Sequence, residues 1–201
     1  MELRTILDLA DHGPDVYVGI GPQYPWGGLY GGQIVAQALM AAAHTVAEEL
    51  PVHSLRAYFI RRGDHHEPVR YEVDRIRDGR SFATRRVVAR QAVGAILNLE
   101  ASFQRDEQSA NVETLAPPPD LPQPETLEQS SWSAAFERAF VPSDRVSPSV
   151  ERDGRGRATA WLRTTEPIGD DRVMQAAALA YMSDDLPTDA VVQAHPVRSE
   201  P

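Results

Sequence analysis

Cysteine and lysine are both absent from this 201-residue chain. Without cysteine, the chain cannot form a disulfide, use a thiolate as a catalytic nucleophile or bind zinc through sulfur. The sequence also lacks any run of 18 or more apolar residues, so it predicts no membrane-spanning helix. The opening segment 1–4 is polar and unlike a signal peptide, which leads us to expect a cytoplasmic protein.

All 20 basic residues are therefore arginine, and the formal net charge of -9 argues against general nucleic-acid binding. The arginines are concentrated in 53–105, which holds 11 of them against 6 acidic residues. An arginine-rich patch in an acidic protein suits a small anionic ligand, because the guanidinium fork matches phosphate. A solvated sheet face is the alternative interpretation of the same residues.

Two alanine-rich segments far apart in the sequence resemble each other. Aligning Gln37 of the first with Gln175 of the second places Asp184 opposite Val46. Such a duplication indicates two copies of one supersecondary module. Because only the second copy carries a carboxylate at this position, we expect the chemistry to lie there. The two segments are 31–43 and 173–184.

The first 105 residues have the pattern of a single antiparallel module. A short strand over 15–20 precedes a helix over 33–50, whose nearly uniform apolar character predicts that it is buried. Four alternating segments follow, and Asp78-Gly79 is typical of a hairpin turn. An antiparallel sheet that wraps one long helix is the hotdog fold, an α+β architecture. The four predicted strands are 53–62, 69–77, 81–91 and 95–103.

After residue 105 the composition changes. Proline-rich sequence predicts a linker, with one short helix over 132–140. A strand over 156–165 and a helix over 171–183 then repeat the start of the first module. A second sheet would need about 40 further residues, so we expect one complete hotdog and an incomplete second one. The predicted units are a first hotdog (1–105), a linker (106–150) and a truncated second hotdog (151–201).

Four blocks, at 30–38, 53–64, 77–87 and 180–184, resemble the acyl-CoA thioesterase II family, the TesB-type double-hotdog thioesterases. The blocks stand in the family's order and spacing, and the resemblance extends over residues 5–190. It implies that the protein hydrolyses acyl-CoA to free fatty acid and CoA. It also implies that no metal, other cofactor or covalent intermediate is needed.

The resemblance assigns Asp184 as the catalytic carboxylate, which activates a water molecule as general base. The family's set also contains a Ser or Thr and a Gln on the second sheet, and we carry neither over to this chain. Gln193 has the wrong context and receives no role. From the residues themselves, the glycine pair Gly31 and Gly32 at a helix start could offer backbone N–H groups to the developing oxyanion.

Three further side chains are candidates for substrate binding. Arg62 and Arg80, with Arg61 beside the first, could meet the CoA phosphates, although arginines at strand ends also serve solubility. His53 is the third candidate, although a histidine at a strand start is more often a structural hydrogen-bonding group. The pair His65-His66 could bind a metal, but without supporting ligands in its turn we expect no metal site.

Each central residue also has a structural interpretation. Asp184 could be a solvated residue at a helix end, where a carboxylate is electrostatically disfavoured. Gly31 and Gly32 could serve only close packing of helix and sheet. Gln37 is interpreted as a hydrogen-bonded core amide.

Two alternatives to a thioesterase remain open on these grounds. A hotdog enoyl-CoA hydratase or dehydratase would need an Asp and His close together after a helix start, and the sequence has no such pair. A non-catalytic acyl-CoA-binding or assembly module would follow from the incomplete second unit. The incomplete second unit would leave an apolar helix and a sheet edge exposed, so we expect either a homo-oligomer that assembles through sheet edges or a chain that is unstable alone.

Overall fold

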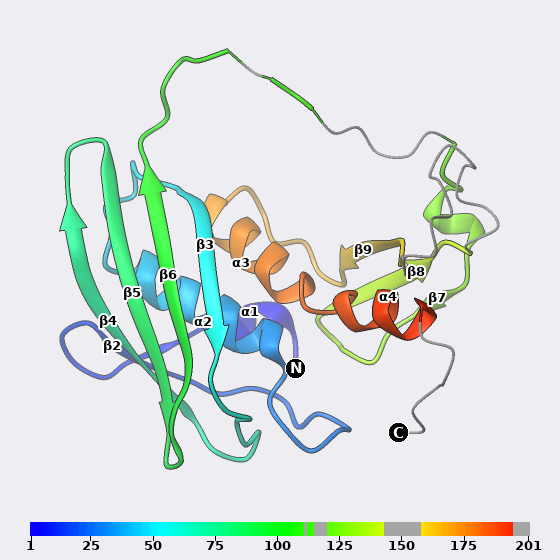
Figure 1. Ribbon diagram of the computed structural model, residues 1–201, viewed down its shortest axis with the longest axis horizontal. Helices are drawn as coiled ribbons and strands as arrows, with labels where there is room; N and C mark the ends of the chain where they lie inside the picture. The colour runs from blue at the N-terminus through cyan, green and yellow to red at the C-terminus, as the bar shows by residue number, and fades with distance from the viewer. Residues whose placement is uncertain (111, 115–119, 143–157, 195–201) are drawn as a thin grey trace.

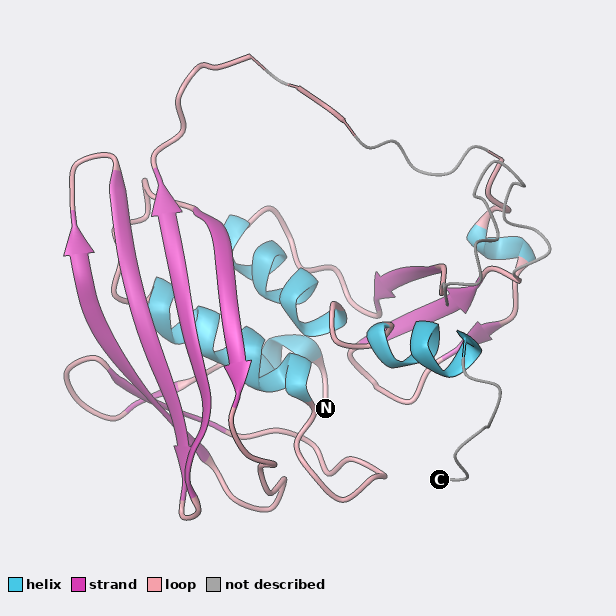
Figure 2. Cartoon of the chain, viewed as in Figure 1, coloured by secondary structure: helices cyan, strands magenta, loops and turns pink. Residues whose placement is uncertain are grey.

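The computed structural model describes residues 1–110, 112–114, 120–142 and 158–194. Its main sheet has six antiparallel strands in the order β1-β2-β4-β5-β6-β3 (Figures 1 and 2). The four strands predicted after the first helix are confirmed as β3 to β6, with small shifts at their ends. The strands are β1 (Ala10–Asp11), β2 (Val16–Gly19), β3 (Val52–Phe59), β4 (Val69–Asp78), β5 (Phe82–Gln91) and β6 (Gly94–Gln104).

Helix α2 (Gly31–Ala43) packs across one face of this sheet, and α1 (Leu3–Leu7) contacts it, which confirms the predicted hotdog arrangement (Figure 1). The helix ends seven residues before the predicted Leu50. A side chain satisfies one of its last carbonyl groups: the Thr45 hydroxyl donates to the Ala42 carbonyl at 2.8 Å. The buried Arg85 guanidinium binds the Thr45 carbonyl at 2.8 Å and anchors the chain where the helix stops.

A second, smaller sheet has the order β7-β8-β9, from β7 (Gln129–Ser130), β8 (Phe136–Phe140) and β9 (Ala160–Thr164). The helix predicted over 132–140 is therefore wrong, since most of that segment is strand β8. Strand β8 pairs with β7 and β9, and its longer pairing joins Phe136 to Thr164 of β9, a distant partner that local sequence does not show. A short 3₁₀ helix, η1 (Pro124–Thr126), precedes this sheet.

The second module begins as the repeat predicts, with β9 followed by α3 (Arg172–Met182). The Asp171 carboxylate caps α3 by accepting from the amides of Val173 at 2.8 Å and Met174 at 3.1 Å. A further helix, α4 (Pro187–Ala194), follows where the sequence showed only mixed turn signals. Residues 111, 115–119 and 143–150 of the predicted linker and 156–157 of the predicted strand lie outside the described residues, and the three-unit division remains a proposal.

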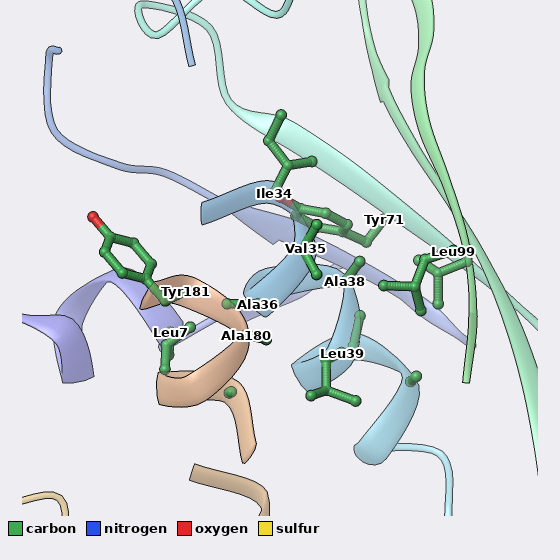
Figure 3. Packing of buried hydrophobic residues seen from close by; sticks show 14 of the residues in the cluster. Leu7, Ile34, Val35, Ala36, Ala38, Leu39, Tyr71, Leu99, Ala180 and Tyr181 are labelled. Atoms are coloured by element: carbon green, nitrogen blue, oxygen red, sulfur yellow. The ribbon is translucent and has the colours of Figure 1, made fainter. Parts of the chain in front are cut away.

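Helices α2 and α3 lie side by side and run in opposite directions (Figures 1 and 3). Alanines such as Ala36, Ala177 and Ala178 are at most 1% exposed, and their small side chains let the two helix axes come close. The start of α2 therefore meets the end of α3. No helix among the described residues has both the length and the apolar character needed to cross a membrane.

Gln37 is buried in the core, as interpreted from the sequence, and its amide is fully used. Its Nε2 donates to the Ile6 carbonyl at 2.7 Å and to the Ile20 carbonyl at 2.8 Å. The Tyr71 hydroxyl donates to its Oε1 at 2.6 Å. The side chain thus ties the N-terminal segment and β4 to α2, which fixes the helix on the sheet.

Candidate functional site

Asp184 lies just beyond the end of α3 and points at the start of α2. Its Oδ2 accepts a hydrogen bond from the Gly32 amide at 3.0 Å. The N-cap residue of α2, Tyr30, supplies no side-chain cap, so Asp184 satisfies a helix amide that would otherwise lack a partner. The negative C-terminal end of α3 disfavours the charge of Asp184, and the positive N-terminal end of α2 favours it.

Gly31 leaves the space that this carboxylate occupies. A β-carbon at residue 31 would lie 2.5 Å from Asp184 Oδ2 and 2.9 Å from the ring of Phe59. The glycine pair thus contacts the expected base directly, and the Gly32 amide already serves the carboxylate. In this structure the Gly32 amide therefore holds Asp184, and the oxyanion role suggested from the sequence stays a prediction.

The electrostatic setting of Asp184 suits a base. Burial is the largest influence and raises the pKa of Asp184 above its ordinary value, and the negative charge of Asp185 raises it further. The amides of Gly32 and Gly31 act in the opposite direction. Asp184 is half-buried, so it is not a solvated residue at a helix end. A carboxylate with a raised pKa accepts a proton more readily than an ordinary aspartate does.

A groove of about 390 Å³ runs from the end of β3 to Asp184. Its walls combine apolar side chains with two arginines, Arg61 and Arg62, at the segment after β3. Arg61 donates to the Ala95 carbonyl at 2.7 Å and Arg62 to the Trp26 carbonyl at 2.5 Å, so both guanidinium groups are held in place. The groove residues are Leu29, Gly31, Ile34, Phe59, Ile60, Arg61, Arg62, Gly63 and Asp184.

A second groove of about 380 Å³ reaches Asp184 from the other side. Aromatic rings dominate one wall, where the Tyr30 and Trp132 ring centroids are 4.8 Å apart and those of Trp26 and Trp132 are 5.0 Å apart. The lining also has polar residues, namely Arg138, Asp185, Thr188 and Asp189. Asp184 is thus reached by two grooves, one flanked by arginines and one lined by aromatic rings.

The structure does not bring the other two predicted binding residues to these grooves. His53 is at the start of β3, where a ring nitrogen lies 2.9 Å from Ser102 Oγ, while the first groove begins at Phe59. Six residues of extended strand correspond to about 20 Å. Arg80 lies in the β4–β5 turn, at the end of the sheet where β3 begins, and its carbonyl accepts from Arg105 Nε at 3.3 Å.

Asp64, His65 and His66 form a cluster whose ligand atoms lie within 4.8 Å of one another. Protein hydrogen bonds already occupy it, because His65 Nδ1 accepts from the Tyr24 amide at 2.7 Å. A neutral His65 must then carry its proton on Nε2, which leaves no free lone pair for a metal. His66 Nδ1 bonds to Asp64 Oδ1 at 2.9 Å, so the cluster is explained as a structured turn.

Family comparisons agree with this geometry. Residues 21–104 match the acyl-CoA thioesterase N-terminal domain, and residues 112–199 match the acyl-CoA thioesterase C-terminal domain. Acyl-CoA thioesterase 2 of Haemophilus influenzae is 38% identical over 202 residues, which cover 92% of this chain and 68% of that protein. The chain belongs to the acyl-CoA thioesterase II family.

Other members of the family support the assignment. Human acyl-coenzyme A thioesterase 8 is 43% identical over 206 residues, which cover 90% of this chain and 64% of that protein. The crystal structure of acyl-CoA thioesterase II TesB2 from Mycobacterium marinum superposes with a TM-score of 0.79 at 33% identity, covering 97% of this chain and 71% of that one. The chain thus spans about two thirds of the length of the human relative.

The resemblance pointed to Asp184, but sequence reasoning missed the residues that surround it in the second groove. Trp132 and Arg138 lie in the stretch interpreted as a linker, and the sequence assigned no role to Asp185, the residue after Asp184. Asp185 is only 7% exposed, and its carboxylate binds both Trp132 and Arg138. The one sequence signal available was the Asp-Asp pair itself, since two adjacent carboxylates at a helix end are electrostatically costly.

Proposed function

We propose that this chain hydrolyses fatty acyl-CoA to a free fatty acid and CoA, with Asp184 as general base. The observation that carries the proposal is the place of the Asp184 carboxylate. It is half-buried, bonded to the start of α2 and open to both grooves. The activity named for the relatives is thioester hydrolysis, and the chemistry of the site is consistent with it.

In the proposed reaction a water molecule lies against Asp184. The carboxylate takes a proton from the water as its oxygen attacks the thioester carbonyl carbon. Collapse of the tetrahedral intermediate breaks the carbon–sulfur bond, and the thiolate of CoA leaves and takes up a proton. The fatty acid keeps the oxygen that came from water, so the reaction needs no electron donor or acceptor.

The charges of the two grooves suggest how the substrate is oriented. Arg61 and Arg62 flank the first groove, and guanidinium groups are suited to the phosphates of CoA. The second groove presents the rings of Trp26, Tyr30 and Trp132, which are suited to an acyl chain. We therefore place the CoA portion toward Arg62 and the acyl portion toward Trp132. Gly31 and Gly32 take part by positioning the base, and His53 and Arg80 have no role in this arrangement.

The test is hydrolysis of a medium-chain acyl-CoA, with released CoA detected as free thiol, by the purified chain and its Asp184→Asn variant. We expect turnover in the parent chain and its loss in the variant. Asp170→Asn, an exposed carboxylate near the other end of α3, is the matched control and should remain active. A folded parent chain that binds acyl-CoA without turnover would instead identify a non-catalytic binding module.

We further propose that the chain forms homo-oligomers through β3 and acts in the cytoplasm. Among the described residues β3 pairs only with β6, and its side chains Leu55, Tyr58 and Phe59 are each more than a third exposed. An open apolar strand edge is suited to pairing with a second copy. Light scattering of the parent chain and of Tyr58→Lys would test the assembly.

For the proposed cytoplasmic location, the absence of cysteine is compatible with a reducing compartment.

A further inference from the structure

The neighbour of the proposed base is itself a carboxylate held in an unusual setting. Asp185 is 7% exposed, and the Arg138 guanidinium donates to its two oxygens at 2.8 and 3.0 Å. The indole N–H of Trp132 donates to Asp185 Oδ1 at 2.7 Å. Arg138 lies on β8 and Trp132 in the loop between β7 and β8, so this cluster joins the small sheet to the end of α3.

The proposed reaction gives Asp185 no chemical step, yet its charge acts on Asp184. The two carboxylates are adjacent in the chain and line the same groove. Like charges at short range disfavour ionisation of each other, and burial strengthens the effect. A base must be ionised to accept a proton, so an unbalanced charge at Asp185 would reduce the active fraction of Asp184.

We propose that Arg138 is a positioning residue for the hydrolysis: by pairing with Asp185 it keeps Asp184 ionised and holds the turn after α3. The inference rests on the proposed function, because it takes Asp184 to be the base. Removing Arg138 leaves a buried carboxylate beside the base whose one remaining donor, among the residues that the structure describes, is the Trp132 indole. Removing the carboxyl charge of Asp185 has the opposite effect on Asp184, since the positive charge of Arg138 then acts on the base alone.

Other charged or titratable groups also lie near Asp184 and influence its ionisation. Arg61 and Arg62 approach it from the segment after β3, and both are fixed by hydrogen bonds to backbone carbonyls. Asp189 faces the same groove from α4, and Tyr30 faces it from the residue before α2. The variants that test the proposal leave all four of these groups in place, so changes can be assigned to the Arg138–Asp185 pair.

The experiment is the pH dependence of kcat/KM, whose acidic limb reports ionisation of the base in the free enzyme. For Arg138→Met we expect the limb to move to higher pH by about one unit, the scale typical of a neighbouring charge. Asp185→Asn should move it to lower pH, and the double variant should return near the parent. Arg138→Lys keeps the positive charge and should restore most of the parental profile.

Arg163→Met is the matched control. Arg163 lies on β9 of the same sheet, is exposed and pairs with Glu137 at 2.6 Å, so its loss should leave the limb unmoved. Turnover that falls equally at every pH in Arg138→Met, with no movement of the limb, would show a purely structural role and overturn the proposal.

A second readout separates this inference from the proposed function. The carboxyl carbon of Asp184 can be titrated by NMR without substrate, its signal being assigned by its loss in Asp184→Asn. Opposite shifts of its midpoint in Arg138→Met and Asp185→Asn would support the charge coupling even if no hydrolysis were found. A midpoint unchanged in both variants would overturn the coupling even in an active enzyme.

Discussion

The α-carbon of Gly32 packs directly against the backbone carbonyl of Tyr181. A β-carbon at residue 32 would lie 2.1 Å from that oxygen, which also accepts the Tyr30 hydroxyl at 2.8 Å. Because the obstacle is backbone, Gly32→Ala must push α2 and α3 apart. We expect a loss of about 1–3 kcal/mol in the free energy of unfolding, measured by urea denaturation. An unchanged midpoint would mean that the helices separate without cost.

Gly31→Ala should reduce activity more than it reduces stability, in contrast to Gly32→Ala. The added methyl group would meet the Asp184 carboxylate and the Phe59 ring, which are side chains that can move aside. We therefore expect a smaller loss of stability than in Gly32→Ala but a larger fall in kcat, because the base is displaced. Measuring kcat/KM and urea stability on the two variants together checks this. Equal activity in Gly31→Ala and the parent would contradict the proposed place of the base.

Arg85 should be among the most sensitive positions for stability. Its guanidinium is buried and donates to Thr45 Oγ1 at 2.7 Å and to the carbonyls of Thr45 and Arg77, each at 2.8 Å. Lysine cannot reproduce this fork, so Arg85→Lys should lower the free energy of unfolding by about 3 kcal/mol or more. Arg86→Lys is the control, since Arg86 is exposed and pairs with Asp74 on the surface. Thermal or urea unfolding should separate the two variants.

The repeat in the sequence could be detected because it lies in local patterns. Alignment of Gln37 with Gln175 correctly predicts that the second module starts with a strand and α3, and it also places Gly31 opposite Gly169. Because α2 and α3 are antiparallel, the pair has two similar ends. At each end the start of one helix lies beside the end of the other. At the end away from Asp184 a cavity of about 630 Å³ has Val46 at the position aligned with Asp184, and its carboxylates come from other positions, Glu48, Asp170 and Asp171.

The features that could not be predicted depend on distant contacts. Strand β8 forms through pairing with β9, and the roles of Trp132 and Arg138 exist only because that sheet meets the end of α3. The contact that the Gly32 amide makes could not be predicted for the same reason. Local sequence predicts a free amide at a helix start, whereas in the fold Asp184 from 152 positions away occupies it.

Replacing the base should stabilise the fold at neutral pH. Burial raises the pKa of Asp184, so the folded state binds this proton more tightly than the unfolded chain does. The stabilisation that this bound proton gives to the folded state is fully present when the pH lies below the pKa of Asp184 in the unfolded chain. It is lost as the pH rises through the pKa of Asp184 in the folded state. The side-chain amide introduced by Asp184→Asn stays uncharged at every pH, and its oxygen can still accept the Gly32 amide hydrogen bond. We expect urea denaturation to show the variant more stable than the parent at pH 7, with the difference shrinking as the pH falls below the ordinary aspartate range. A variant that is less stable at pH 7 would show that the charged carboxylate itself holds the start of α2, through the helix dipole, more strongly than burial opposes it.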